Sequence, residues 1–557
     1  MPATATTERA PFHWLNDDIR TFLRRGYLLD GVTAEERVRQ IADHAESILG
    51  IDGFGDTFFE YVGRGYYSLA SPIWSNFGLN RGLPISCFGS HIEDSMDSIL
   101  DTHAEVGMMT KVGGGTSGYF GELRPRGAAI KNNGTTNGTY PFAQLFDTII
   151  NVVSQGETRR GHFAGYIDIE HPDVDEWLNI QSDGDAIQTM YYGVVVGDEW
   201  MEAMIEGDAD KRALWARVIE ARMNHGIPYI LFRDNIQRGR PQVYKDKGYD
   251  VRASNLCSEI ALPATADESF VCCLSSMNAL HYDDWKNTNA VEVMTFFLDA
   301  VMQEFIDGAS GTKHMERAVR FAKRHRAIGI GILGWHSYLQ SKRIPFESMD
   351  ANMQGAEIAK TIKERSYAAS ADLADRFGEP EVLEGYGRRN ATTMAVAPTK
   401  SSSFILGQVS PSIEPIKSNY FVQDRAKAKV TYKNPYLQDL LEEKGCNTEA
   451  VWDDIALRDG SVQHLDVLTD EEKAVFKTFS EISQMEIINQ AASRQKHIDQ
   501  SQSLNLAIDP SNTPVKEINK LYIEAWRSGV KSLYYQNGVN AAQSLSRELL
   551  ACRSCEG

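Results

Sequence analysis

Short apolar runs alternate along the chain with longer amphipathic stretches. The short runs are rich in β-branched and aromatic residues, which is typical of buried strands. They cover residues 191–196, 229–232, 328–333, 392–397 and 504–508. Strands that alternate with helices along a chain indicate an α/β fold built on a mainly parallel sheet.

Two of the amphipathic stretches carry clear signals for the start and end of a helix. Residues 33–36 (Thr-Ala-Glu-Glu) have the form of a capping box, and apolar residues follow at helical spacing from Val38 to Gly50. Near the other end of the chain, Thr513 and Pro514 precede a second helical pattern that ends at Gly529. Because no internal repeat or low-complexity linker interrupts the chain, we expect one large domain.

The composition is that of a globular protein, with 42% hydrophobic and 24% charged residues. The formal net charge is −19, so the chain lacks the basic surface that binding along a nucleic-acid backbone needs. The start of the chain has no signal-peptide pattern, and no apolar run approaches the roughly 18 residues of a membrane span. We therefore expect a cytoplasmic protein that binds neither polymer nucleic acid nor a membrane.

Seven cysteines are spread thinly along the chain, which does not indicate a disulfide framework. Taken singly, they are as readily explained as small buried side chains. One of them lies in a distinctive segment, residues 255–263 (Asn-Leu-Cys-Ser-Glu-Ile-Ala-Leu-Pro). If this segment is extended, the alternate residues Asn255, Cys257 and Glu259 point to the same side.

The segment closely resembles the finger-loop motif of ribonucleotide reductase large subunits, whose central cysteine becomes a transient thiyl radical. The resemblance implies that Cys257 carries the radical, that Glu259 is the general base and that Asn255 holds the substrate hydroxyls. It also implies two further cysteines that face each other below the substrate ribose. Cys87 matches the first and Cys272 the second, with the adjacent Cys273 left open as an alternative.

The carboxyl end carries two more motifs of this family. Residues 531–537 (Lys-Ser-Leu-Tyr-Tyr-Gln-Asn) resemble the tandem tyrosines of class I members, which implies radical transfer through Tyr534 and Tyr535. Cys552 and Cys555 form a CxxC pair, with no second CxxC to complete a four-ligand zinc site. In the family such a tail carries reducing equivalents into the active site.

The resemblance also implies partners. A separate metal-containing small (β) subunit would supply the radical, and thioredoxin or glutaredoxin would reduce the tail. The chain itself would bind no metal or redox cofactor. It would bind a nucleotide substrate together with a dNTP or ATP as specificity effector, and it would form a homodimer.

Two groups of loop residues are candidate nucleotide sites. Residues 398–402 follow a strand pattern, and their amides and hydroxyls suit a phosphate. The resemblance implies that the substrate is bound by Ser71, Ser86, Pro398, Thr399, Lys400, Ser401 and Ser402. It also implies that the effector is bound by Asp94, Arg124, Gln155 and Arg159. Lys400 stands where relatives often have an acidic or small residue, which bears on the preferred phosphate chain, and Glu157 and Arg160 leave the effector preference open.

The resemblance extends from about residue 14 to the terminus and predicts the fold in more detail. It implies an α/β architecture, a ten-stranded α/β barrel of two parallel five-stranded halves around a central finger loop. We expect a helical region without an ATP cone in residues 1–70, the catalytic barrel in 71–537 and a mobile redox tail in 538–557. The expected activity is the reduction of ribonucleotides to deoxyribonucleotides, with diphosphates favoured over triphosphates.

Three other interpretations are weaker. An adenosylcobalamin-dependent reductase shares the finger loop and the cysteine pair, but the tandem tyrosines weigh against it. A glycyl-radical enzyme would need a C-terminal glycyl-radical motif, which we do not find. A catalytically inactive nucleotide-binding regulator would not need a cysteine at every chemical step.

Overall fold

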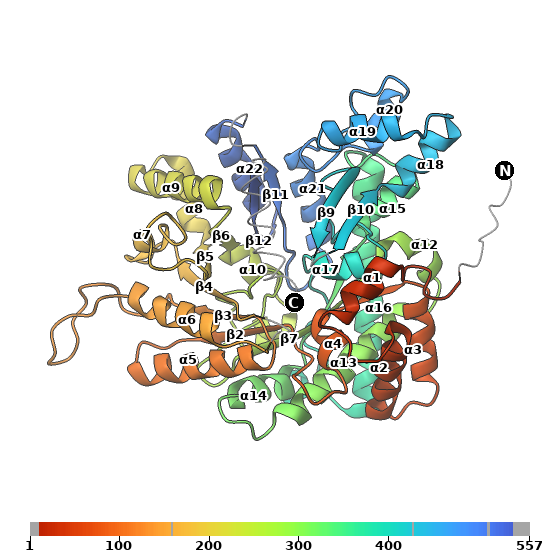
Figure 1. Ribbon diagram of the computed structural model, residues 1–557. Helices are drawn as coiled ribbons and strands as arrows, with labels where there is room; N and C mark the ends of the chain where they lie inside the picture. The colour runs from red at the N-terminus through yellow and green to blue at the C-terminus, as the bar shows by residue number, and fades with distance from the viewer. Residues whose placement is uncertain (1–9, 157–159, 426–427, 510–512, 539–557) are drawn as a thin grey trace.

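One twisted sheet forms the centre of the computed structural model, which describes residues 10–156, 160–425, 428–509 and 513–538 (Figure 1). In these residues the sheet has nine strands, in the order β1-β7-β2-β3-β4-β5-β6-β12, with β8 beside β7. The strands are β1 (Tyr67–Leu69), β2 (Cys87–His91), β3 (Thr116–Tyr119), β4 (Phe163–Asp168), β5 (Tyr191–Val196), β6 (Tyr229–Phe232), β7 (Phe270–Asn278), β8 (Ile328–Leu333) and β12 (Ser532–Leu533).

The sheet contains two groups of parallel strands that are joined by an antiparallel contact between β2 and β7, and β1 and β12 run antiparallel to their neighbours β7 and β6. Strands β2 to β6 form a parallel five-stranded half. The second half begins with β7 and β8, which are also parallel, and β7 runs antiparallel to β2. The expected α/β barrel is confirmed, and three predicted strands, β5, β6 and β8, have the predicted bounds.

The second half is less regular than we expected. Among the described residues, 392–397 form no continuous strand and make only isolated parallel bridges, Ile330 to Met394 and Val396 to Gln502. A side chain explains the break, because the Asp499 carboxylate accepts the N–H groups of Thr393 and Met394, both at 2.9 Å. The last predicted strand is shortened to β11 (Leu506–Ile508), which pairs with β13 (Gln536–Gly538).

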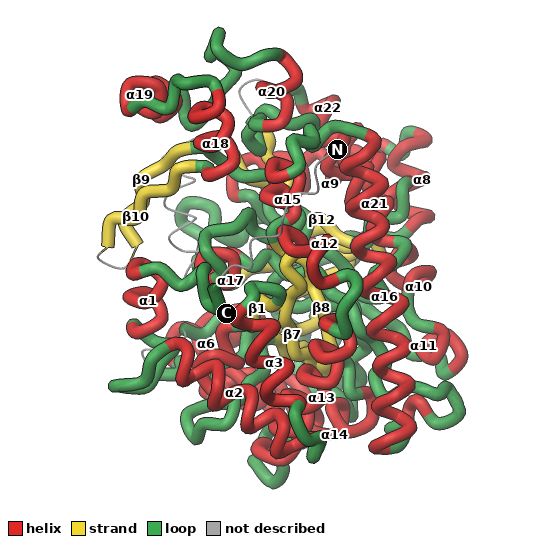
Figure 2. Tube along the Cα trace, turned by 90° about the vertical axis from the view of Figure 1, so that its right-hand side faces the viewer, coloured by secondary structure: helices red, strands yellow, loops and turns green. Residues whose placement is uncertain are grey.

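Helices surround the sheet on its outside (Figure 2). The predicted capping box begins α2 (Ala34–Leu49), with Glu36 N donating to Thr33 Oγ1 and Thr33 N to the Glu36 carboxylate. Helix α2 packs against α3 (Phe54–Gly63) and α13 (Ala290–Ala309), so the N-terminal helices share the main core. The predicted C-terminal helix is α22 (Val515–Arg527), which starts one residue later than expected, with Pro514 as its N-cap.

The other helices are mostly short. Within the described residues, none combines the length and the apolar character that crossing a bilayer requires. They are α1 (Asp17–Arg24), α4 (Ser71–Asn76), α5 (Met96–Lys111), α6 (Tyr140–Val152), α7 (Val174–Trp177), α8 (Asp198–Glu206), α9 (Ala209–His225), α10 (Arg233–Gly239), α11 (Gln242–Asp246), η1 (Ala279–His281), α12 (Tyr282–Trp285), α14 (Glu316–His325), α15 (Trp335–Ser341), α16 (Met349–Phe377), η2 (Glu381–Leu383), α17 (Lys400–Ile405) and α21 (Gln484–Gln495).

A small helical unit lies beside the barrel and has its own core. The hairpin of β9 (Tyr420–Arg425) and β10 (Ala428–Lys433) leads into α18 (Pro435–Glu443), α19 (Glu449–Leu457) and α20 (Asp470–Val475) (Figures 1 and 2). Leu437, Leu441 and Trp452 belong to a hydrophobic cluster that is separate from the main one. The sequence pattern did not indicate this separate core.

A buried ionic cluster ties α13 to the second half of the barrel. The Asp299 carboxylate accepts from Arg326 Nε at 2.8 Å, from Arg389 Nε at 2.9 Å and from Asn390 Nδ2 at 3.0 Å. Burial alone would raise the pKa of Asp299, but the two guanidinium groups lower it overall. The native state therefore depends on the ionised form of this carboxyl group.

We predict that Asp299→Ala lowers the free energy of unfolding by about 3–5 kcal/mol, because it leaves two buried guanidinium groups without their anion. Because the folded-state pKa lies below the unfolded value of about 3.9, the loss is largest above about pH 4 and shrinks as the pH falls through the folded-state pKa. Urea unfolding at several pH values measures it. The control is Asp307→Ala, an exposed position on the same helix. An equal loss in both variants would contradict the prediction.

Candidate active site

A cavity lies between the two halves of the barrel. Its walls come from β1, the start of β2 and the middle of β7, from the loop that precedes β7, and from residues 395–402. The lining residues are Ser68, Ala70, Ser86, Cys87, Gly115, Leu256, Cys257, Glu259, Leu274, Ser275, Ser276, Ala395, Ala397, Pro398, Thr399 and Ser402.

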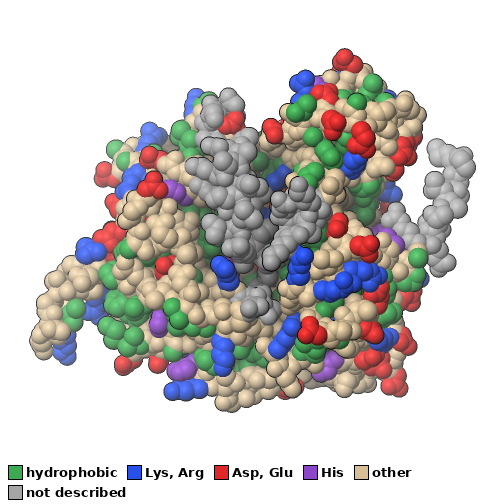
Figure 3. All heavy atoms as spheres, in the orientation of Figure 1, with side chains coloured by type: hydrophobic (Ala, Val, Ile, Leu, Met, Phe, Trp, Pro, Cys, Tyr) green, Lys and Arg blue, Asp and Glu red, His purple; other side chains and the backbone are tan. Residues whose placement is uncertain are grey.

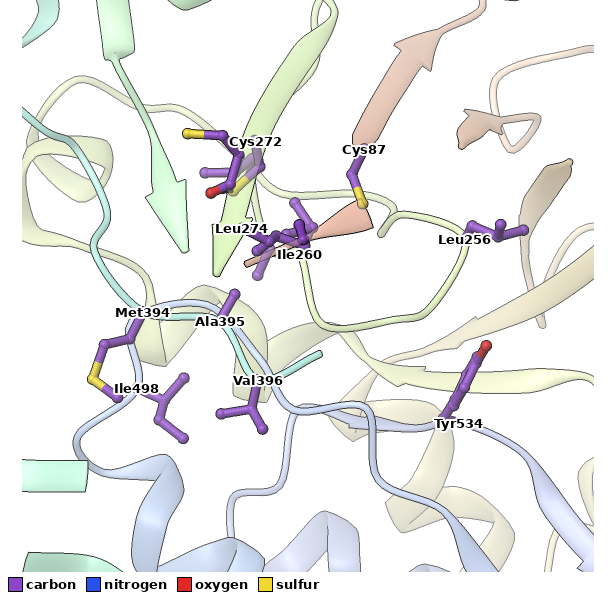
Figure 4. Close-up of a cluster of buried hydrophobic side chains, with 14 of the residues drawn as sticks. Cys87, Leu256, Ile260, Cys272, Leu274, Met394, Ala395, Val396, Ile498 and Tyr534 are labelled. Atoms are coloured by element: carbon purple, nitrogen blue, oxygen red, sulfur yellow. Dashed lines mark hydrogen bonds between the residues drawn. The ribbon is translucent and has the colours of Figure 1, made fainter. Parts of the chain in front are cut away.

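Two of the predicted cysteines meet where the halves of the barrel join. Cys87 on β2 and Cys272 on β7 are direct partners in the antiparallel register, and Figure 4 draws them on these neighbouring strands. Directly opposed residues project to the same face, with Cβ atoms about 4.5–5.5 Å apart. Cys87 lines the cavity, whereas Cys272 is fully buried next to it.

The neighbouring Cys273 points elsewhere. Its thiol donates to the carbonyl of Leu298 on α13 at 3.3 Å, on the outer side of the sheet. Successive residues of a strand face opposite sides, so Cys272 and Cys273 cannot both face Cys87. The geometry therefore favours Cys272 as the partner, the residue that the sequence resemblance also favoured.

Burial raises the pKa of the Cys272 and Cys273 thiols, and that of Cys272 lies well above its ordinary value. Thiols with so high a pKa stay protonated at neutral pH. Each therefore keeps a hydrogen atom to give away, and neither reacts readily as a thiolate.

The finger loop contradicts one expectation about local shape. The chain turns at Leu256, Cys257 and Ser258 instead of running extended, and Ser258 has a φ of 65°. The argument that alternate residues share one face was therefore wrong. The side chains still converge on one region, because the turn brings Cys257 and Glu259 to the cavity wall.

Asn255 does not line the cavity and instead supports it from behind. Its Nδ2 donates to the Cys87 sulfur at 3.1 Å, and its Oδ1 accepts from Ile260 N at 3.2 Å. The hydroxyl of Tyr166 on β4 donates to the Asn255 carbonyl. The amide thus connects the finger loop to the first of the two opposed cysteines.

The other side of the finger loop is held by Ser501 and Ser503. Ser501 N donates to the Glu259 carbonyl at 2.8 Å, and Ser503 Oγ donates to the Glu259 carboxylate at 3.1 Å. The same hydroxyl also contacts the carbonyl of Cys257. Glu259 is 1% exposed, so its carboxyl group is held in place at the cavity wall.

The predicted substrate residues fall into two groups. Ser86, Pro398, Thr399 and Ser402 line the cavity. Ser71, Lys400 and Ser401 do not, although all three are adjacent in sequence to lining residues. Figure 3 shows the face of the molecule that is turned to the viewer in Figure 1. Lys and Arg side chains lie around its middle, near α4 and α17, although the chain has a net charge of −19.

The predicted effector residues are only partly brought together. Asp94 and Arg124 form an ion pair at 2.7 Å near the surface. Gln155 instead turns inward, where its Nε2 donates to Asn76 Oδ1 at 2.9 Å and to the Arg81 carbonyl at 3.0 Å. Arg159 lies outside the described residues.

The tandem tyrosines belong to a larger aromatic cluster that the sequence did not indicate. The rings of Tyr534 and Tyr535 lie 4.2 Å apart between centroids, and the ring of Tyr229 on β6 lies 4.8 and 5.3 Å from them. Tyr191 on β5 lies 5.8 Å from Tyr535. Their backbone is fixed by residues 504 and 505, since Tyr534 N donates to the Leu504 carbonyl. The tail pair, Cys552 and Cys555, lies outside the described residues.

Comparison with known proteins agrees with this geometry. The family model for the ribonucleotide reductase barrel domain matches residues 85–211, 206–385 and 380–536. The ribonucleoside-diphosphate reductase large subunit of Invertebrate iridescent virus 3 is 34% identical, over 86% of each chain. The large chain of Neurospora crassa is 28% identical, over 94% of this chain and 64% of its own length.

A solved structure shows the same fold at higher identity. The class Id ribonucleotide reductase alpha subunit of Actinobacillus ureae superposes with a TM-score of 0.91 at 58% identity, covering 98% of this chain and all of the other. The matches extend over the barrel, the finger loop and the tandem tyrosines. The chain therefore belongs to the ribonucleotide reductase family, among the large, catalytic subunits of class I.

Proposed function

We propose that this chain reduces ribonucleoside diphosphates to 2′-deoxyribonucleotides through a thiyl radical on Cys257. One observation carries the proposal. Cys87 and Cys272 oppose each other in the strand register, beside the cavity that Cys257 and Glu259 line. The relatives are ribonucleoside-diphosphate reductases, which supports a diphosphate substrate.

The proposed reaction begins at the 3′ carbon of the ribose. A ribose C–H bond is too weakly acidic for a side chain to remove its proton, so a sulfur radical on Cys257 takes the whole hydrogen atom. Glu259 accepts the proton of the 3′ hydroxyl as general base, and the 2′ hydroxyl leaves as water. The position of Glu259, held by Ser503, suits this task.

Two thiols complete the reduction. Cys87 and Cys272 together give two electrons and two protons, which replace the lost hydroxyl with a hydrogen and complete the water molecule. One disulfide forms between them, and Cys257 returns the 3′ hydrogen. The atoms balance: two thiols and one C–OH give one disulfide, one C–H and one water.

The radical on Cys257 has to come from outside the cavity. Tyr534 and Tyr535 are the proposed transfer residues, since neighbouring tyrosines can pass an electron together with a proton. As a class I large subunit, the chain works with a separate β subunit that supplies the radical. The contact of both tyrosine rings with Tyr229 supports a continuous aromatic route.

The remaining assignments follow the same proposal. Pro398, Thr399, Ser402 and Ser86 bind the substrate, with Ser71, Lys400 and Ser401 around them, and residues 71–537 form the catalytic domain. Helices α1 to α3, among residues 10–70, belong to the N-terminal region that packs on this domain. Asp94, Arg124, Gln155 and Arg159 form the effector site of a homodimer that binds a dNTP or ATP.

Residues 538–557 form the proposed redox tail. Cys552 lies seventeen positions after Tyr535, roughly 56 Å of extended chain at about 3.3 Å per residue. That length allows Cys552 and Cys555 to reach the Cys87–Cys272 disulfide and exchange with it. Thioredoxin or glutaredoxin would then reduce the tail.

We predict that Cys257→Ser abolishes reduction of cytidine diphosphate by the chain with a class I β subunit, because a serine hydroxyl does not form the required radical. Nucleotide binding, measured by equilibrium dialysis, should stay within about twofold of wild type, because the exchange only replaces the sulfur atom of the side chain with oxygen. The matched control is Cys446→Ser, a cysteine in the separate helical unit. Full activity in Cys257→Ser would refute the mechanism, and activity with adenosylcobalamin in place of the β subunit would refute the class assignment.

We predict that Cys552→Ser stops turnover after the first cycle. Single-turnover product should match wild type, because the first reduction uses only thiols within the barrel. Multiple turnover with thioredoxin and its reductase should fall to background, and a small dithiol that enters the cavity should restore part of it. Loss of the single-turnover product would contradict the assignment of Cys552 to the tail step.

A further inference from the structure

The amide of Gln500 contacts the buried cysteine of the opposed pair. Its Nε2 lies 3.6 Å from the Cys272 sulfur and donates also to Thr392 Oγ1 at 3.0 Å and to the Ile328 carbonyl at 3.1 Å. Its Oε1 accepts from Ala261 N, in the finger loop, at 3.2 Å. Gln500 is fully buried, so every group of its amide is used inside the protein.

Each of the two opposed sulfurs contacts the side-chain amide nitrogen of a buried residue. Cys87 receives an N–H from Asn255 at 3.1 Å, and Cys272 shares an N–H of Gln500, at 3.6 Å, with a nearer acceptor. Each donor amide also binds a backbone group of the finger loop, Ile260 N in one case and Ala261 N in the other. The loop that carries Cys257 is thus linked through one amide to each of the two cysteines.

The backbone at Gln500 is anchored on both sides. Lys531 Nζ donates to the carbonyls of Asp499 and Gln500, both at 2.7 Å. The Asp499 carboxylate holds the N–H groups of residues 393 and 394 and accepts from Lys363 Nζ at 3.0 Å. Because these contacts fix the main chain, the Gln500 amide has little freedom to turn away from Cys272.

We propose that Gln500 is a positioning residue for the reducing step, which holds the Cys272 sulfur toward Cys87 and stabilises it as its hydrogen leaves. In the reduced protein the Cys272 thiol directs its own hydrogen to the Cys273 carbonyl at 3.7 Å. The N–H contact from Gln500 keeps the sulfur in place when that hydrogen is lost. The same contact lowers the pKa of Cys272, against the larger effect of burial.

This inference rests on the proposed function, because it assigns Gln500 to the step that forms the Cys87–Cys272 disulfide. No covalent bond of Gln500 is formed or broken in this step. The two thiols still give two electrons and two protons to the substrate, and the amide keeps its hydrogens throughout. It therefore acts through Cys272 and does not touch the nucleotide.

The test measures single-turnover reduction of cytidine diphosphate by the full chain with a class I β subunit, without added dithiol. Gln500→Met should slow product formation about tenfold, the effect expected when one hydrogen bond to the reacting group is lost. The dissociation constant of cytidine diphosphate should stay within about twofold of wild type. The matched control is Gln502→Met, since Gln502 is equally buried but donates to Ala491 O and Gln495 Oε1, away from Cys272.

A second variant separates a donor role from a packing role. Gln500→Glu keeps the shape and donates to sulfur only while protonated. The titratable groups that contact residue 500 are Cys272, Asp499 and Lys531. Cys273, Glu259 and Tyr244 lie further off and interact with Cys272. The rate of Gln500→Glu relative to wild type should therefore fall as the pH rises, while the Gln502→Met ratio stays constant.

Three results would overturn the inference: a Gln500→Met rate within about twofold of wild type, an equal loss in Gln502→Met, or a Gln500→Glu ratio that does not change with pH. If wild type itself gives no product, the proposed function and this inference fall together. If wild type reduces the substrate and any of the three results appears, only the inference falls.

Discussion

The antiparallel contact between β2 and β7 is the constraint on which the site depends. Strands β2 to β6 are parallel to one another, as are β7 and β8, and the two groups meet at the β2–β7 pair. The register there sets Cys87 opposite Cys272, and a shift by one residue would turn Cys272 away from the cavity. Burial then keeps the thiol of Cys272 protonated, so this thiol holds its hydrogen until a strong oxidant is formed beside it.

A turn placed inside a protein needs partners for its backbone groups, and residues 499–505 supply them. Gln500 binds Ala261 N, Ser501 binds the Glu259 carbonyl, and Ser503 binds the Glu259 side chain. Residues 504 and 505 fix the backbone of the tandem tyrosines. One segment therefore connects the proposed radical cysteine, its base, the buried thiol and the radical entry route.

The sequence was a good guide wherever structure depends on neighbours along the chain. Strands β5, β6 and β8 and the capping box of α2 appear at the predicted residues, because hydrophobic runs and caps are local signals. The predicted strand at 392–397 is not continuous, because the carboxylate of Asp499, about a hundred positions away, accepts the N–H groups of Thr393 and Met394. The finger loop was wrongly expected to be extended, since a turn with Ser258 at positive φ depends on the surrounding protein. The contacts of Tyr229 and Gln500 likewise have no local signal.

The most direct test of this account is to identify the disulfide that one turnover leaves behind. The chain would be mixed with a β subunit and cytidine diphosphate without dithiol, quenched in acid, and mapped by mass spectrometry after alkylation of free thiols. The account predicts one Cys87–Cys272 disulfide for each deoxynucleotide formed, with Cys273 alkylated. Product accompanied by a Cys87–Cys273 disulfide, or by no disulfide within the barrel, would contradict it.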